Sequence, residues 1–93
     1  MARYFLSYDL NGSTPTHSEM DKHLEKSFSS RQRILETVWF VCSNKTTSQV
    51  FDYVNSILSN NDRLIVIEAN SGVWRNLLGG DQTLLKKWNE CSS

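Results

Sequence analysis

A single aspartate at the end of an apolar run is the residue whose position in this chain most directly suggests chemistry. Residues 4–12 read YFLSYDLNG, and Asp9 is the first charged residue after Arg3. A carboxylate is a hard oxygen ligand of the kind that holds Mg²⁺ or Mn²⁺ for phosphodiester hydrolysis. Asp also ends strands, because its carboxylate accepts hydrogen bonds from the amides of a following turn. A contact with a partner is a third interpretation, and the residues alone leave all three open.

One carboxylate per chain makes a metal site only if a two-fold axis brings a second copy beside it. Two carboxylates at close range repel each other unless a cation or a shared proton neutralises them. Ser7 shares the face of Asp9 on an alternating strand, so its hydroxyl can hold a metal-bound water. Alternatively, Ser7 is a small residue where two sheets approach. Tyr8 points to the opposite face and is expected in the core.

Candidate contacts to nucleic acid come from four basic residues. Arg31 and Arg33 lie in the polar segment SFSSRQR, Lys45 opens the next turn, and Arg75 follows Trp74. Lys and Arg side chains in such segments either contact phosphates or remain solvated. Trp39 and Trp74 could stack on bases, although core or dimer packing is the competing interpretation for a tryptophan inside a strand.

Composition limits the classes of function. The 93 residues carry 10 Lys and Arg against 10 Asp and Glu, so the net charge is zero. This balance argues against strong sequence-independent nucleic-acid binding, which needs a basic domain, but leaves room for a local patch. No Ser-His-Asp or Cys-His arrangement, Gly-rich phosphate loop or zinc signature is found. The apolar stretch in MARYFLSYD is too short for a secretory signal and ends at an acid, and no stretch has the length of a membrane span. We therefore expect a cytoplasmic protein without a membrane partner.

The cysteines and histidines add no metal site to this interpretation. Cys42 and Cys91 are far apart and outside any CxxC, and in a cytosolic chain we expect them to be free thiols. His17 and His23 are six residues apart, on different faces of any helix, and are expected at the surface.

Five main elements would position these residues. We expect a strand over residues 3–9, a turn-rich loop, and a helix that begins at a capping box formed by Thr16 and Glu19. Residues 27–33 are read as a helix exit and a loop, followed by one strand over 34–42 that is central or meets a partner. A second capping box, Thr46 with Gln49, starts a helix that ends near residues 60–61, and 64–67 is a third strand.

The C-terminal part is less regular. Residues 73–77 form a possible short fourth strand, Gly79-Gly80 breaks the chain, and Asp81 can cap a final helical turn. Two long helices over three or four strands predict an α+β fold, the ferredoxin-like βαββαβ sandwich with an antiparallel sheet and two helices on one face. We expect one domain over residues 1–93, with a core at 3–77 and a short C-terminal extension at 78–93.

Four motifs in order also carry a family resemblance. They are SYDLN at the end of the first strand, TVWFV in the second, NDRLIVIEA at the third, and VWRNL after it. Over residues 3 to 77 the chain resembles the ferredoxin-like family that includes the CRISPR-associated spacer-acquisition protein and its VapD-like toxin relatives. It is most similar to the SinR-like branch, which has YxISYDLN and STWIV motifs.

The resemblance implies a homodimer with its two sheets stacked about a two-fold axis. It implies that Asp9 faces its mate and holds a divalent metal, for which we expect Mg²⁺ or Mn²⁺. Strand alternation adds Ser7 beside it, so Asp9 and Ser7 are the expected catalytic residues. The expected function is a metal-dependent endoribonuclease or nuclease acting on RNA or DNA. The balanced charge, the Ser-rich helix exit and the tail after Gly79-Gly80 depart from the family and argue first against DNA scaffolding. The alternative is a non-catalytic dimeric module that binds nucleic acid or a protein partner in phage–host or defence biology.

Overall fold

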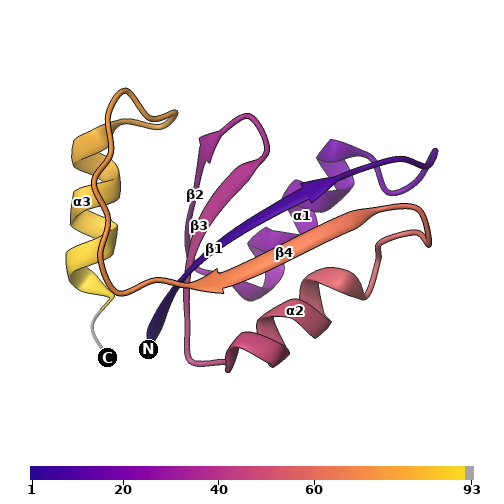
Figure 1. Ribbon diagram of the computed structural model, residues 1–93, viewed down its shortest axis with the longest axis horizontal. Helices are drawn as coiled ribbons and strands as arrows, with labels where there is room; N and C mark the ends of the chain where they lie inside the picture. Colours follow the sequence, from indigo (N-terminus) through magenta and orange to yellow (C-terminus); the bar gives the residue numbers. More distant parts are fainter. Residues whose placement is uncertain (92–93) are drawn as a thin grey trace.

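The computed structural model describes residues 1–91, which form a four-stranded antiparallel sheet and three helices (Figure 1). The strand order in the sheet is β2-β3-β1-β4. The elements follow one another as β1 (Ala2–Asp9), α1 (His17–Ser27), β2 (Ser30–Leu35), β3 (Val38–Ser43), α2 (Thr47–Asn55), β4 (Arg63–Glu68) and α3 (Asp81–Glu90). The predicted α+β class is confirmed, and this arrangement is compatible with a ferredoxin-like sandwich.

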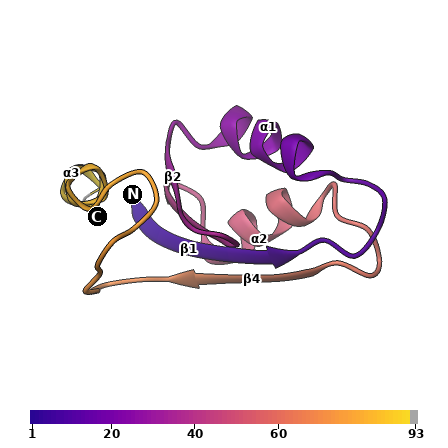
Figure 2. The ribbon, with the colours of Figure 1, turned by 90° about the horizontal axis from the view of Figure 1, so that it is seen from above.

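Helices α1 and α2 cover one face of the sheet, as Figure 2 shows from above. Both begin where the capping boxes predict, because Thr16 and Thr46 each accept a hydrogen bond from the amide three residues later, and Glu19 and Gln49 reach back to the cap amide. Such reciprocal bonds satisfy donors that a helix start otherwise leaves unpaired. α2 ends at Asn55, earlier than expected, and two short turns lead on to β4.

The predicted single strand over 34–42 is wrong, because the chain reverses at residues 36–37 and makes a hairpin of β2 and β3. Ser30–Arg33 belong to β2, although their polar composition predicted a loop. Arg31 pairs with Val41 and Arg33 with Trp39 across the hairpin. An edge strand tolerates charged side chains, and its backbone bonds to β3 override weak local β propensity.

The third predicted strand is confirmed as β4, whereas the possible strand over 73–77 is wrong. Residues 69–80, which we call the strap, run without helix or strand from β4 to α3. The carboxylate of Asp81 accepts hydrogen bonds from the amides of Asn76 and Leu77 at 3.0 and 2.7 Å. These bonds close a turn at the end of the strap, so Asp81 supports the strap instead of capping α3, whose N-cap residue is Gly80. α3 is also a full helix and not one turn; residues 92–93 of the predicted extension lie outside the described residues.

The sheet separates two apolar clusters. The helix-side cluster includes Tyr4, Leu6 and Tyr8 of β1 packed with residues of α1 and α2. The opposite cluster joins Phe40 of β3 to Leu84 and Trp88 of α3. Because side chains alternate along β1 and β3, each of these central strands contributes apolar residues to both clusters, as expected for β3.

The expectation of free thiols is wrong for this structure. Cys42 of β3 and Cys91, the C-cap residue of α3, form a disulfide with a Cα–Cα distance of 5.9 Å. Their separation of 49 residues hid the pairing, because only the packing of α3 on the hairpin brings them together. His17 is exposed as predicted, but His23 is half-buried and stacks on Tyr53 with ring centroids 4.1 Å apart.

Candidate functional site

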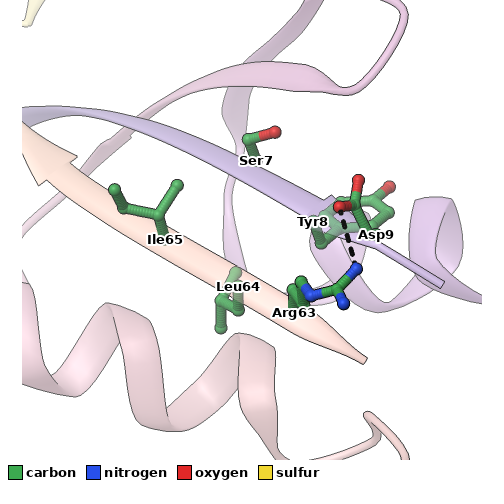
Figure 3. Close-up of a pocket in the computed structure, with 6 residues that line it drawn as sticks. All are labelled: Ser7, Tyr8, Asp9, Arg63, Leu64 and Ile65. Atoms are coloured by element: carbon green, nitrogen blue, oxygen red, sulfur yellow. Dashed lines mark ion pairs between the residues drawn. The ribbon is translucent and has the colours of Figure 1, made fainter. Parts of the chain in front are cut away.

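Asp9 lies at one end of the sheet beside an arginine from the neighbouring strand (Figure 3). It pairs in register with Arg63 of β4, and its Oδ2 lies 3.9 Å from Nη1 of that guanidinium. Ser7 and Ile65 form the next cross-strand pair on the same face of the sheet, two residues away on each strand. Both of these pairs line an open pocket of about 160 Å³. Drug-sized ligands usually occupy cavities of roughly 300–1,000 Å³, so this pocket alone does not enclose a nucleotide.

Strand alternation decides which side chains reach this pocket. Ser7 and Asp9 point to the face opposite α1 and α2, which we call the open face. Tyr8 is buried on the helix side, as predicted, where its hydroxyl accepts a hydrogen bond from Trp39 Nε1 at 3.2 Å. Burial raises the pKa of Tyr8, and the hydrogen bond from Trp39 opposes this effect. Tyr8 is therefore a core residue that anchors the strand carrying the candidate site.

The turn after β1 is held by a different carboxylate. The amides of Asn11 and Ser59 donate to Asp62 at 2.7 Å each, and Asn11 Nδ2 donates to the carbonyl of Asn61. The bonds from the amides of Asn11 and Ser59 lower the pKa of the Asp62 carboxyl below its ordinary value of 3.8. The interpretation of Asp9 as the acceptor for turn amides is therefore wrong, because Asp62 receives the Asn11 amide.

Asp9 is left with a weak and exposed ion pair. Its side chain is 57% exposed and that of Arg63 is 77% exposed. Exposed pairs of this kind contribute about 0–1 kcal/mol to stability, because water screens them and both side chains lose rotamer freedom. The carboxylate can therefore exchange the guanidinium for another ligand at little cost to the fold.

The residues around Asp9 provide part of a cation site. Ser7 adds a hydroxyl, which donates to Thr37 Oγ1 at 3.4 Å, so a single chain offers one carboxylate and one hydroxyl as hard oxygen ligands. Across residues 1–91 no group of three or more His, Cys, Asp or Glu side chains gathers at metal-binding distance. One carboxylate and one hydroxyl are oxygen ligands of the type that Mg²⁺ or Mn²⁺ prefers, but they are too few to form a complete site within one chain.

The four basic residues predicted to contact nucleic acid do not line this pocket. Arg31 and Arg33 belong to β2, where Arg31 lies 3.9 Å from Glu25 of α1 and Arg33 donates to the carbonyl of Glu36. Their partners in β3 face the helices, so both arginines lie on the helix side of the sheet. Lys45 follows β3 at the opposite end of the sheet from Asp9, and Arg75 lies in the strap. Their role in binding stays a prediction, but they form no common patch with Asp9.

The two tryptophans raised as base-stacking candidates take part in packing. Trp39 is 9% exposed within the helix-side cluster, which fits the core interpretation. Trp74 is half-buried and lies against Trp88 with ring centroids 5.6 Å apart. Neither ring lines the Asp9 pocket.

Arg63 is the residue of this site that the sequence did not single out. It lies within NDRLIVIEA, just before the apolar residues of the third expected strand. Antiparallel pairing of the first and last strands of a βαββαβ unit places the start of β4 beside the end of β1, and this is the one signal that would have linked Arg63 to Asp9. That signal depends on the fold and not on any local motif.

Fold and site together define a small α+β protein with a carboxylate–guanidinium pair on an open sheet face. Comparison with protein-family models, with curated proteins and with solved structures gives no match for this chain. Within residues 1–91, no helix has the length and apolarity needed to cross a membrane.

Proposed function

We propose that this chain acts as a homodimeric, divalent-metal-dependent endonuclease for RNA or DNA, of the kind its motifs resemble. Within the proposal, the fold is the ferredoxin-like sandwich of that family, and Asp9 from each of two subunits holds the metal. The observation that carries the proposal is the position of Asp9: its carboxylate has no role in the turn, is mostly exposed, and lies 3.9 Å from a guanidinium.

A carboxylate beside a guanidinium suits a phosphodiester substrate. Mg²⁺ or Mn²⁺, when bound, supplies charge stabilisation and an activated water. Asp9 would ligate the cation, and the hydroxyl of Ser7 would position water. Arg63 would donate to a phosphate oxygen, for which the planar fork of arginine is well suited.

The surface next to Asp9 is suited to a second copy of the chain. α3 packs on the open face near the start of β1, and α3 and the strap lie away from the Asp9 end of that strand (Figure 1). Ile65 and Ile67 of β4 are 56% and 52% exposed on this face. Neighbouring exposed apolar residues on a sheet mark interaction surfaces. Pairing two such faces about a two-fold axis would bring two Asp9 carboxylates towards each other.

Nuclease assays with Asp9→Asn test the activity. We expect Mg²⁺- or Mn²⁺-dependent cleavage of RNA or DNA by the purified protein, and its loss in the variant. Asp52→Asn, an exposed aspartate on α2, is the matched control and should cleave normally. Absence of cleavage by the unmodified protein, or full activity in Asp9→Asn, would reject the nuclease proposal.

The ion pair itself favours a second candidate, a non-catalytic dimeric module that binds nucleic acid or a protein. A guanidinium 3.9 Å from the carboxylate competes with a divalent cation, and the net charge of zero gives no general attraction to polyanions. This candidate predicts binding without turnover, with an affinity that survives Asp9→Asn. A dimer structure also separates the two: Asp9 carboxylates more than about 8 Å apart cannot share one ion at ordinary ligand distances.

The proposed location is the cytoplasm, where either candidate would meet its nucleic-acid or protein partner. Thiols in that compartment are kept reduced, and cytosolic disulfides are usually transient. In that compartment the Cys42–Cys91 pair can therefore change between the disulfide and the two free thiols.

A further inference from the structure

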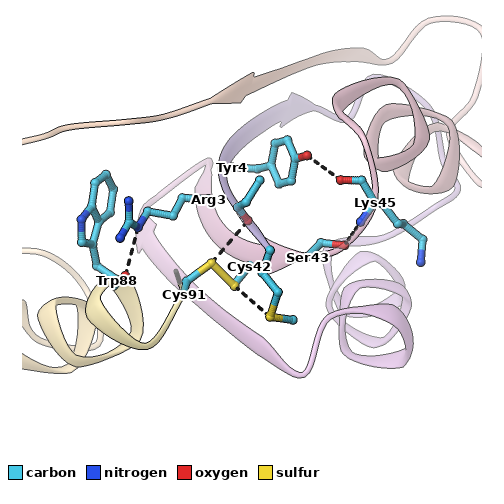
Figure 4. The surroundings of a disulfide bond; sticks show 9 residues. Arg3, Tyr4, Cys42, Ser43, Lys45, Trp88 and Cys91 are labelled. Carbon is cyan, nitrogen blue, oxygen red and sulfur yellow. Dashed lines mark hydrogen bonds between the residues drawn. A yellow bond between two sulfur atoms is a disulfide. The ribbon is translucent and has the colours of Figure 1, made fainter. Parts of the chain in front are cut away.

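The disulfide ties the end of α3 to an inner strand of the sheet, near the last residue of that strand (Figure 4). Cys42 lies on β3, an inner strand, and Cys91 caps the C-terminus of α3. Cys91 Sγ lies 3.4 Å from the carbonyl oxygen of Ala2, so the bond also lies against the first residues of β1. It is the one covalent connection between the sheet and α3 other than the strap.

α3 belongs to a cluster separate from the one that holds α1 and α2. The helix-side cluster contains no residue of the strap or α3. On the opposite face, Leu84 and Trp88 are 0% and 9% exposed against Phe40 and Ile34. α3 can therefore leave the sheet without removing any side chain from the helix-side cluster, the condition for a local opening of part of a fold.

A few polar contacts hold α3 in addition to this burial. Arg3 donates to the carbonyl of Trp88 at 3.0 Å, and its guanidinium carbon lies 4.5 Å from the centre of the indole ring. Lys87 Nζ donates to the carbonyl of Arg31 at 2.7 Å. The strap adds the bonds from the Leu78 amide to the Ile34 carbonyl and from the Ala69 amide to the Arg3 carbonyl. Gln32 Nε2 also donates to the carbonyls of Leu78 and Gly80 in the strap, at 2.9 and 3.1 Å. All of these contacts are non-covalent, so the disulfide is the bond that most restrains α3 from leaving the sheet.

We propose that the Cys42–Cys91 disulfide is a redox latch that keeps α3 on the open face of the sheet. A dithiol reductant attacks one sulfur, forms a mixed disulfide, and resolves it with its second thiol. The Cys42–Cys91 bond breaks, the reductant gains an intramolecular disulfide, and two electrons and two protons pass to the cysteines. The reduced chain then opens at α3 and the strap more often than the oxidised chain does.

Opening has a defined consequence for the surface of the protein. Phe5, Ile34 and Phe40 would become accessible on the open face. Ile67 of β4 is already exposed there and pairs in register with Phe5, so the apolar area would become continuous. Reduction would thereby enlarge the surface available for association, whether or not the protein is a nuclease.

Hydrogen–deuterium exchange of the full chain with and without dithiothreitol tests the latch. We expect the amides of α3 to exchange at least about tenfold faster after reduction, while those of α1, α2 and the inner strands change little. Mass and thiol titration confirm the disulfide before reduction. The Cys42→Ser/Cys91→Ser double variant should behave like the reduced chain in the absence of any reductant.

Two controls keep the outcome decisive. Dithiothreitol added to the double variant should have no effect, which separates the latch from other actions of the reductant. If the double variant does not fold, the reduced natural chain gives the same measurement. Unchanged protection of α3 after reduction would overturn the proposal, and so would uniform loss of protection in every element, since the disulfide would then stabilise the whole fold and not the docking of α3.

Discussion

The carboxylate of Asp62 accepts the backbone amide of Asn11 at 2.7 Å, although the two residues are 51 apart in the sequence. This bond connects the turn after β1 to the turn before β4, at the end of the sheet that carries the candidate site. It leaves Asp9, for which support of that turn was one of three interpretations, without a part in it. The pair Asp62–Asn11 thus explains how an aspartate at the end of a strand can be available for a ligand.

Asp62→Ala should lower the stability of the folded chain. It removes the acceptor for two backbone amides, Asn11 and Ser59, and loosens the connection between β1 and β4. Thermal or urea unfolding at pH 7 measures the loss, and Asp21→Ala on the exposed side of α1 should have little effect. An Asp62 variant as stable as the natural chain would contradict the role given to this carboxylate.

The Asp62 interaction should also depend on pH. Its folded pKa lies below the ordinary value of 3.8, so the folded state binds fewer protons than the unfolded state in the window between the two values. The contribution of Asp62 to stability is therefore complete above that ordinary value and is lost as the pH falls through the folded pKa. The free energy of unfolding, measured as the pH is lowered, should therefore fall more in the natural chain than in Asp62→Asn, which lacks this carboxylate.

Arg63→Gln should separate binding from folding. The guanidinium is exposed and its ion pair with Asp9 is long, so the free energy of unfolding should change by less than about 1 kcal/mol. If the chain is a nuclease, the variant should bind substrate less tightly while it retains metal binding through Asp9. Steady-state kinetics and metal titration measure the two effects, and tighter substrate binding in the variant would contradict the phosphate-contacting role.

Ile65→Lys should prevent association through the open face. The side chain is 56% exposed beside the Asp9 pocket, so a charge there changes the surface and not the core. Light scattering should report a dimer for the natural chain and a monomer for the variant, with an unchanged circular dichroism spectrum. Ile57→Lys, an exposed apolar residue that precedes β4 and lies away from the Asp9 pocket, is the control and should remain dimeric. A monomeric natural chain would exclude both functional candidates in their dimeric form.

Tyr8→Phe should destabilise the core beneath the site. Trp39 Nε1 donates to the Tyr8 hydroxyl in a buried position, and its loss leaves a donor unpaired at a cost of about 1–3 kcal/mol. Urea unfolding measures the difference.

Because burial raises the pKa of Tyr8 above 10.0, the folded state keeps this proton when the unfolded state has lost it. Stability from this group is therefore complete below pH 10.0 and falls as the pH rises through the folded pKa, and Tyr8→Phe should lack that decrease.

Local patterns predicted the elements whose evidence is carried by neighbouring residues. Thr16 with Glu19 and Thr46 with Gln49 marked both helix starts, because a capping box closes within four residues. Alternation placed Tyr8 on the buried side of β1 and Asp9 on the other. Strand boundaries that depend on pairing with a neighbouring strand were predicted wrongly. Residues 31–33 were expected in a loop, but they belong to β2 because they pair with β3.

The sequence by itself therefore determined the α+β class, the starts of the two capped helices, the buried face of β1 and the placement of Asp9 on the face opposite Tyr8. Only the tertiary structure decided what each of these residues meets. It paired Cys42 with Cys91 and placed Arg63 beside Asp9. It also made Asp62 the acceptor for the Asn11 amide in the turn after β1. The physical reason is range: capping and alternation act over two to four residues, whereas these three contacts join segments far apart in the chain that meet only when the sheet is complete.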